Sequence, residues 1–131
     1  LGRRLLLKVE TLMHSGDEMP QVIPSTPLAE ALMAITSKGL GMTTVIDEQG
    51  NLKGVFTDGD LRRAIDNGVD IHHSTIENLM TVGGKTTHPD LLAAEALTVM
   101  EDNKINALVA VKDGTPVGVI TMHDMLKAGV V

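Results

Sequence analysis

Two short segments of the chain carry the same pair of polar side chains at the same spacing. Thr57 and Asp60 lie in GVFTDGDL, and Thr121 and Asp124 lie in GVITMHDM. A threonine hydroxyl can donate to a phosphate, and a carboxylate, which only accepts hydrogen bonds, can receive both hydroxyls of a ribose. A helix that begins here would add free backbone N–H groups, which favour a phosphate. The pair therefore suits the phosphate–ribose edge of a nucleotide.

The same spacing also has a purely structural use. A threonine at a strand end, with an acid three residues later, forms a capping box at a helix N-terminus. A cap tolerates Ser, Asn or Asp in place of Thr, so two threonines in two copies favour a ligand. The residues alone leave both interpretations open.

The elements around these pairs repeat as well. LAEALMAI (residues 28–35) and AAEALTVM (93–100) lie 65 residues apart, and each places apolar side chains at i, i+3, i+4 and i+7. This spacing predicts an amphipathic helix with one buried face. Upstream, VETLM (9–13) aligns with IENLM (76–80).

After each predicted helix, two short apolar runs flank a turn that contains glycine, which predicts a β-hairpin. The runs are residues 43–46 and 52–57 in the first copy, and 108–111 and 116–121 in the second. A second helix is expected from Asp58 and from Met122.

The predicted fold class is therefore α/β, with two β-α-β-β-α repeats related by pseudo-twofold symmetry. A copy of about 60 residues can hardly cover its own sheet, so we expect the copies to pack sheet against sheet. We place repeat 1 at residues 9–70 and repeat 2 at 71–131, with the end of a linker at 1–8.

Composition excludes several functions. The 131 residues carry a formal charge of −6, no Cys, Trp or Tyr, and one Phe. Disulfides, thiol catalysis and cysteine metal sites are excluded, and a general nucleic-acid binder would need a basic face. Neither DGD (58–60) nor HH (72–73) has metal-ligand spacing around it. We predict no metal site and no catalytic residue.

The repeated segments resemble the G-h-x-T-x-x-D signature (h, apolar) of CBS domains, which pair into Bateman modules. More closely, the segments LGRRLLLKVETLMHSGDE, GVFTDGDLRRAIDNGVDI and MHDMLKAGVV resemble the C-terminal CBS pair of bacterial arabinose-5-phosphate isomerases. In that family an N-terminal domain interconverts ribulose 5-phosphate and arabinose 5-phosphate, at the entry to Kdo synthesis for lipopolysaccharide. The chain begins with Leu, so we expect a fragment without that domain.

The resemblance implies a nucleotide in the cleft between the copies, held by both Thr–Asp pairs. The base would contact the entry strand and the start of the hairpin in each copy. These expected base contacts are Val22, Ile23, Met42, Thr43 and Thr44 in copy one, and Thr87, His88, Ala107 and Leu108 in copy two. The cations that could meet an anionic ligand are Arg62, Arg63, Lys85, His88 and His123, and each is equally explained as a solvated surface residue.

The implied function is regulatory, without a required cofactor, in the cytoplasm. CMP-Kdo, the nucleotide-linked end product, and an adenine nucleotide (AMP or ATP) are the two expected ligands. The expected partners are the isomerase domain of the same chain and a second CBS pair in a homodimer. The alternative is a structural dimerisation module without a ligand.

Overall fold

The computed structural model describes residues 5–131, and the linker expected at 1–8 therefore lies partly outside them. The chain divides into two compact units. One unit is continuous and runs from Met19 to Gly84. The other joins the segment that ends at Glu18 to residues Lys85–Val131.

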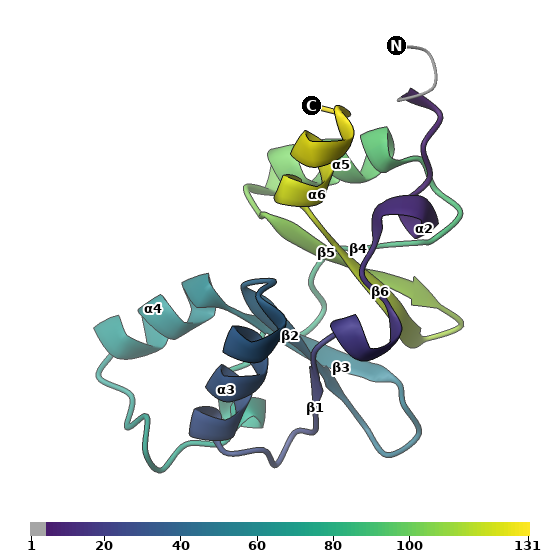
Figure 1. The fold of residues 1–131 in the computed structure, drawn as a ribbon. Coiled ribbons are helices and arrows are strands. Elements are labelled where there is room, and N and C mark those ends of the chain that lie inside the picture. Colours follow the sequence, from purple (N-terminus) through teal and green to yellow (C-terminus); the bar gives the residue numbers. More distant parts are fainter. Residues whose placement is uncertain (1–4) are drawn as a thin grey trace. The chain divides into compact units, whose positions relative to one another are not determined.

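The continuous unit contains one complete copy of the predicted repeat (Figure 1). Its sheet has the order β1-β2-β3, with β1 parallel to β2 and β2 antiparallel to β3. Its elements are β1 (Gln21–Val22), α3 (Leu28–Lys38), β2 (Met42–Ile46), β3 (Leu52–Thr57), α4 (Asp58–Asp66) and the 3-10 turn η2 (Ile76–Asn78).

The second unit repeats this arrangement with the sheet order β4-β5-β6. Its elements are α2 (Val9–Leu12), the 3-10 turn η1 (Gly16–Glu18), β4 (Thr86–Thr87), α5 (Ala93–Asn103), β5 (Ala107–Lys112), β6 (Thr115–Thr121) and α6 (Met122–Ala128). Asp113 and Gly114 form the turn between β5 and β6, both with positive φ, as a two-residue hairpin requires. The predicted α/β class and the two β-α-β-β-α repeats are confirmed.

Each unit has its own apolar core, built on the helical stripe seen in the sequence. Leu28, Ala31 and Ile35 of α3 are buried with Val45 and Phe56 of the adjacent strands. In the second unit, the corresponding α5 residues pack in a cluster of Val9, Ala93, Ala96, Met100, Leu108, Ala110, Ile120 and Met125. The spacing thus identified the buried face of both helices.

The compact units and the sequence repeats begin and end at different places. Helix α2 lies at the start of repeat 1, but it packs against α5, α6 and β6 of repeat 2. Ile76 of η2 lies in the first part of repeat 2, but it is buried in the core formed by α3, β2 and β3 of repeat 1. Each aligned VETLM or IENLM segment therefore completes the core of the other copy.

The segments VETLM and IENLM both end in Leu-Met, and the residues that follow them are His14 and Thr81. Each of these residues is joined to the edge strand of its unit. His14 and Val119 exchange two backbone hydrogen bonds, with N···O distances of 2.8 and 2.9 Å. Thr81 and Val55 exchange the equivalent pair at 2.8 and 3.0 Å. These bridges place position 14 and position 81 beside the strands that end in the two signature threonines.

The signature glycines permit this close approach. A Cβ at Gly54 would lie 2.8 Å from the Thr81 carbonyl oxygen and 2.9 Å from Met80 Sδ. A Cβ at Gly118 would collide with Met13 Sδ and lie 3.1 Å from the carbonyl oxygen of His14. Glycine is required here because the crossing segment occupies the space of a side chain.

We expect Gly54→Ala and Gly118→Ala each to lower the free energy of unfolding by about 1–3 kcal/mol, the usual cost of overpacking. Urea denaturation would measure the change. Gly84→Ala is the matched control, because its Cβ would meet only Thr81 Cγ2 at 3.8 Å, and its effect should stay within about 0.5 kcal/mol. Equal losses in all three variants would contradict the role given to the bridges.

Candidate functional site

The first Thr–Asp pair caps helix α4. Thr57 ends β3, and its Oγ1 accepts a hydrogen bond from the Asp60 backbone N–H at 3.2 Å. The Thr57 backbone N–H and hydroxyl in turn donate to Asp60 Oδ2, at 2.9 and 3.1 Å. The capping box considered from the sequence is therefore formed.

The second pair caps helix α6 in the same way. Thr121 Oγ1 accepts from the Asp124 backbone N–H at 3.1 Å, and the Thr121 N–H and hydroxyl both donate to Asp124 Oδ2 at 2.8 Å. In both copies one carboxylate oxygen is thus used by the cap, and the other, Oδ1, faces different groups.

Asp60 Oδ1 receives two further donors. The Thr81 hydroxyl donates to it at 3.0 Å, and Arg63 Nη2 forms an ion pair with it. Asp60 is buried, with 7% of its surface exposed. A carboxylate offers about four lone-pair positions, and the four donors to Asp60 fill them.

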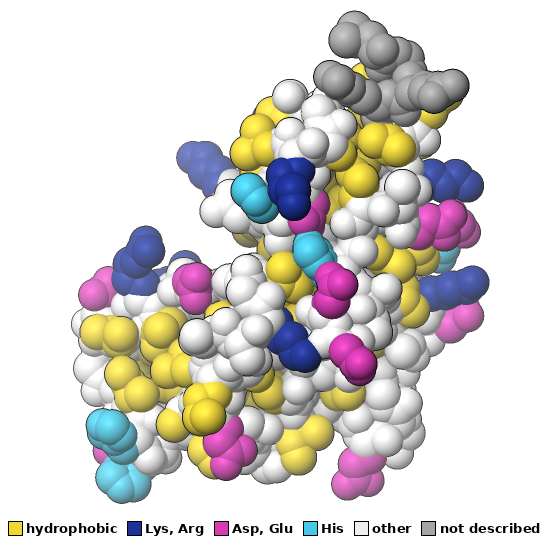
Figure 2. Space-filling view, viewed as in Figure 1, with side chains coloured by type: hydrophobic (Ala, Val, Ile, Leu, Met, Phe, Trp, Pro, Cys, Tyr) yellow, Lys and Arg dark blue, Asp and Glu magenta, His cyan; other side chains and the backbone are white. Residues whose placement is uncertain are grey.

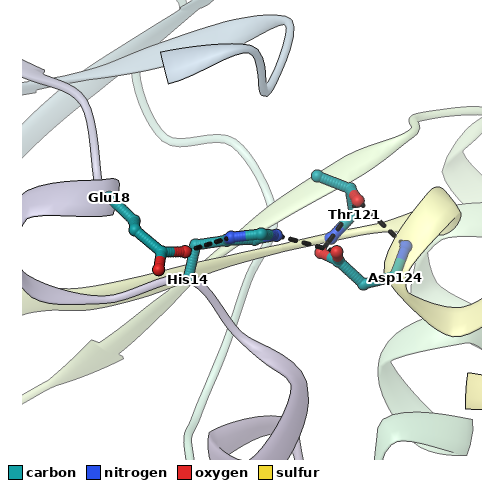
Figure 3. A network of polar contacts seen from close by, with 4 residues as sticks. All are labelled: His14, Glu18, Thr121 and Asp124. Carbon is teal, nitrogen blue, oxygen red and sulfur yellow. Dashed lines mark hydrogen bonds and ion pairs between the residues drawn. The ribbon is translucent and has the colours of Figure 1, made fainter. Parts of the chain in front are cut away.

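Asp124 Oδ1 faces a histidine instead. His14 Nε2 lies 2.7 Å from it, and His14 Nδ1 lies 2.7 Å from Glu18 Oε1 (Figure 3). The Asp124 carboxylate thus has three partners among the described residues, against four for Asp60. One of the roughly four lone-pair positions of the Asp124 carboxylate thus has no donor among these residues.

The surroundings of His14 favour its charged form. Partial burial lowers the pKa of His14, but the hydrogen bonds and negative charges of Glu18 and Asp124 outweigh it, and the pKa is raised above 6.5. A protonated imidazole donates from both ring nitrogens. When His14 is protonated, a cation therefore lies between the carboxylates of Glu18 and Asp124.

The expected base-binding residues lie on the same sheets as the Thr–Asp pairs. Met42 is paired across the sheet with Thr57, and Ala107 with Thr121. On the first strand of each copy, Val22 pairs with Val45 and Thr87 with Ala110. Thr43, Thr44 and Leu108 are buried within the hairpins, and Ile23 is half exposed just after β1.

The buried threonines differ in whether their hydroxyls are satisfied. Thr44 donates to the Pro20 carbonyl at 2.8 Å, and Thr43 to the Thr44 carbonyl at 3.1 Å. Thr87 is also buried, but its Oγ1 is the one buried side-chain polar atom without a hydrogen-bond partner among residues 5–131. Copy one has Val22 at the position aligned with Thr87. An unpaired buried hydroxyl is unusual and calls for a specific reason.

The expected cationic residues lie at the surface. Arg62, Lys85 and His123 are exposed, and it is Arg63 that contacts the signature carboxylate. His88 is partly exposed, and its Nδ1 accepts from the Asp90 backbone N–H at 3.1 Å. The acceptor role leaves the hydrogen of neutral His88 on Nε2.

Sequence reasoning missed the partners of the two carboxylates, which are His14 with Glu18 in one unit and Thr81 in the other. The signal was present in the alignment of VETLM with IENLM. His14 and Thr81 are the residues that follow these aligned segments, so they occupy equivalent positions.

The sequence profile of the CBS domain family matches residues 9–67 and 76–131. The chain therefore belongs to the CBS domain family, and the two matches confirm the predicted pair. They occupy most of the chain, so the printed sequence holds a CBS pair and not a sugar isomerase domain.

Among curated proteins, the arabinose 5-phosphate isomerase KdsD of Pseudomonas aeruginosa is 62% identical over 131 residues, which cover 99% of this chain and 40% of that protein. KdsD of Escherichia coli K12 is 46% identical over 131 residues, with 100% and 40% covered. The chain thus spans about 40% of the length of these relatives.

Solved structures share the fold. An uncharacterized conserved protein of Pyrococcus horikoshii matches with a TM-score of 0.85 and 28% identity, over 95% of this chain and 93% of its own. The CBS pair of protein MJ0100, in complex with 5-methylthioadenosine and S-adenosyl-L-methionine, matches at 0.83 and 22%, over 93% and 94%. CBSX2 in complex with AMP matches at 0.80 and 23%, over 95% and 96%.

Residues 5–131 hold no group of three His, Asp or Glu side chains placed to bind a metal ion. They also hold no helix with the length and apolar character needed to cross a bilayer.

We expect Thr57→Ala and Thr121→Ala each to lower the free energy of unfolding by about 1 kcal/mol, because each removes a helix cap. Thermal or urea denaturation would measure this. Thr→Ser at either position should retain most of the stability. Thr98→Ala is the control, since the Thr98 hydroxyl donates to the Ala94 carbonyl at an exposed mid-helix position and caps nothing. A loss there as large as at Thr57 would contradict the assignment.

Proposed function

We propose that the chain is the regulatory nucleotide-binding part of a KdsD-type arabinose 5-phosphate isomerase in the cytoplasm, and that copy two holds the tighter site. The observation that carries the proposal is the buried, unpaired hydroxyl of Thr87. It lies on the entry strand, where the resemblance places the ligand's base, and a hydrogen bond to the base would satisfy it.

Asp124 supports the same choice of site. It has room for one more hydrogen bond, whereas a ribose at Asp60 must first displace Thr81 or Arg63. Thr121 and Asp124, with Thr87, His88, Ala107 and His123, would form the tighter site. Thr57 and Asp60, with Val22, Ile23, Met42, Thr43, Thr44 and Arg62, would form the weaker one.

The ligand is expected to be a nucleotide. AMP in CBSX2 and S-adenosyl-L-methionine in MJ0100 both contain adenosine, which favours an adenine nucleotide. CMP-Kdo is the alternative that we favour for a Kdo-pathway enzyme, because it joins a nucleotide to an acidic sugar. Its carboxylate would meet the positive charge of His14 or an exposed cation such as His123.

Isothermal titration calorimetry of this chain against CMP-Kdo, CMP, AMP and ATP would test the proposal. Thr87→Val keeps the shape of the side chain and removes the hydroxyl. We expect nucleotide affinity to fall roughly 2- to 10-fold, the worth of one hydrogen bond. The free energy of unfolding should stay the same or rise, because an unpaired buried hydroxyl is removed.

Thr86→Val is the matched control, since Thr86 is the exposed neighbour on the same strand, and it should bind as the unchanged chain does. Equal affinity of Thr87→Val and the unchanged chain would remove Thr87 from the site. If none of the four compounds binds, the regulatory function fails and the structural alternative stands.

A structural role in assembly is the second candidate, and a specific surface favours it. Figure 2 shows hydrophobic side chains gathered over α3 and α4. Met33 of α3 is 71% exposed and Ile65 of α4 is 53% exposed. An exposed apolar patch of this kind is typical of a protein–protein contact, and a homodimer of CBS pairs would cover it.

If this patch joins two copies, Met33→Glu should convert a dimer to a monomer, because a buried charge without a partner is costly. Light scattering after size exclusion would measure the mass. Leu126→Glu, at another exposed apolar position (55%) in the other unit, is the control and should leave the mass unchanged. A dimer that survives both changes would place the contact elsewhere.

A further inference from the structure

The ring of His14 has carboxylate oxygens at both ends. The distances from Nε2 to Asp124 Oδ1 and from Nδ1 to Glu18 Oε1 are both 2.7 Å. A neutral imidazole has one donor and one acceptor nitrogen, and an ionised carboxylate can only accept. The neutral ring would therefore direct a lone pair at one of the two carboxylates. The observed geometry is that of the doubly protonated imidazolium.

The equivalent position in the other unit has no such dependence on protonation. The Thr81 hydroxyl donates to Asp60 Oδ1 at 3.0 Å, and a hydroxyl keeps its proton at any ordinary pH. The second partner, Arg63, is an arginine whose guanidinium remains charged. The contacts of Asp60 should therefore be the same on both sides of neutrality.

The groups that raise the pKa of His14 are Glu18 of η1 and Asp124 of α6. Strand β6, which pairs with His14 through Val119, contains no titratable residue. Helix α5 packs against α2 and contributes Glu95, Glu101 and Asp102. The titratable groups on the nearer elements are Glu10 of α2, Asp17 and Glu18 of η1, and His123, Asp124 and Lys127 of α6. Glu18 and Asp124 make the contacts described above.

We propose that His14 is a positioning residue that holds Asp124 and η1 together as an imidazolium, and that its loss of a proton makes the second Thr-x-x-Asp site responsive to pH while the first is not. The charged ring fixes the orientation of Asp124 and keeps a positive charge beside it. The deprotonated ring gives up one of its two bonds, and either loss frees Asp124 from η1.

The direction of the stability change follows from the raised pKa of His14. The contribution of His14 is fully present below the unfolded value of about 6.5. It is lost as the pH rises through the higher folded pKa. Stability due to His14 should therefore fall between slightly acidic and slightly alkaline pH.

His14→Thr tests this, because it installs the residue that the other copy uses. At pH 5.5 the melting temperature of the variant should be lower than that of the unchanged chain, by about 3 °C or more if the ion pairs contribute on the order of 1 kcal/mol. The difference should shrink as the pH is raised to 8.5. His72→Thr, in an exposed loop of the other unit, should show no such pH-dependent difference.

The protonation of His14 can also be measured without any loss of stability. NMR titration of the ring nitrogens in the unchanged chain should give a pKa above 6.5, with both nitrogens protonated below it. Glu18→Gln, at a side chain that is 71% exposed, should fold normally and lower that pKa. A His14 pKa at or below 6.5, or no response to Glu18→Gln, would overturn the proposal.

The ligand consequence rests on the proposed nucleotide site. The affinity ratio of the unchanged chain to His14→Thr, measured with AMP and with CMP-Kdo, should fall several-fold from pH 6 to pH 8.5. The ligand's own titration cancels in this ratio. If this affinity ratio does not change with pH while the NMR and melting results are as expected, His14 is an imidazolium that does not control the ligand site. Absence of binding at every pH would refute the proposed function alone.

Discussion

The arrangement of both sites depends on two short backbone bridges, His14 with Val119 and Thr81 with Val55. Each bridge ties a segment from the start of one repeat to the edge strand of the other repeat, two residues before a signature threonine. The buried glycines at positions 54 and 118 leave the space that the crossing Leu-Met segment needs. Without this approach, neither His14 nor Thr81 would reach the carboxylate it contacts. The glycine of the family signature is thus required for packing. The close approach that it permits brings Thr81 to Asp60 and His14 to Asp124.

The capping boxes show that a structural and a functional role can use the same atoms. The threonine and Oδ2 of the aspartate are occupied by the helix cap in both copies. The atoms left for the proposed ligand are Oδ1 and those of the strands, and the surroundings of Oδ1 differ between the copies. Copy one surrounds Oδ1 with a hydroxyl and a guanidinium, whereas copy two provides an imidazole and leaves one lone pair available. Two copies of one fold have thereby acquired different chemistry through changes at a few positions.

Much of this fold could be predicted from the sequence, because its signals are local. The stripe of α3, the Asp-Gly turn before β6 and the capping spacing each depend on neighbouring residues, and all three are present in the structure. The contacts of Asp60 with Thr81 and of Asp124 with His14 instead join residues 21 and 110 positions apart in the chain. No local pattern encodes these contacts. The sequence could not predict that the Thr87 hydroxyl lacks a hydrogen-bond partner, because this depends on the residues packed around the side chain. The packing of one sheet on the other stays a prediction.

The segments VETLM (9–13) and IENLM (76–80) each pack in the core of the other repeat. This arrangement has a consequence for the order in which the chain folds. The unit Met19–Gly84 is continuous, so all of its core is available as soon as that stretch has left the ribosome. The other unit needs α2, which precedes that stretch, and α5 and α6, which follow it. Val9 of α2 can therefore be buried only after α5 and α6 have been synthesised, since domains generally fold as complete units. In this respect one CBS unit is an insertion within the other.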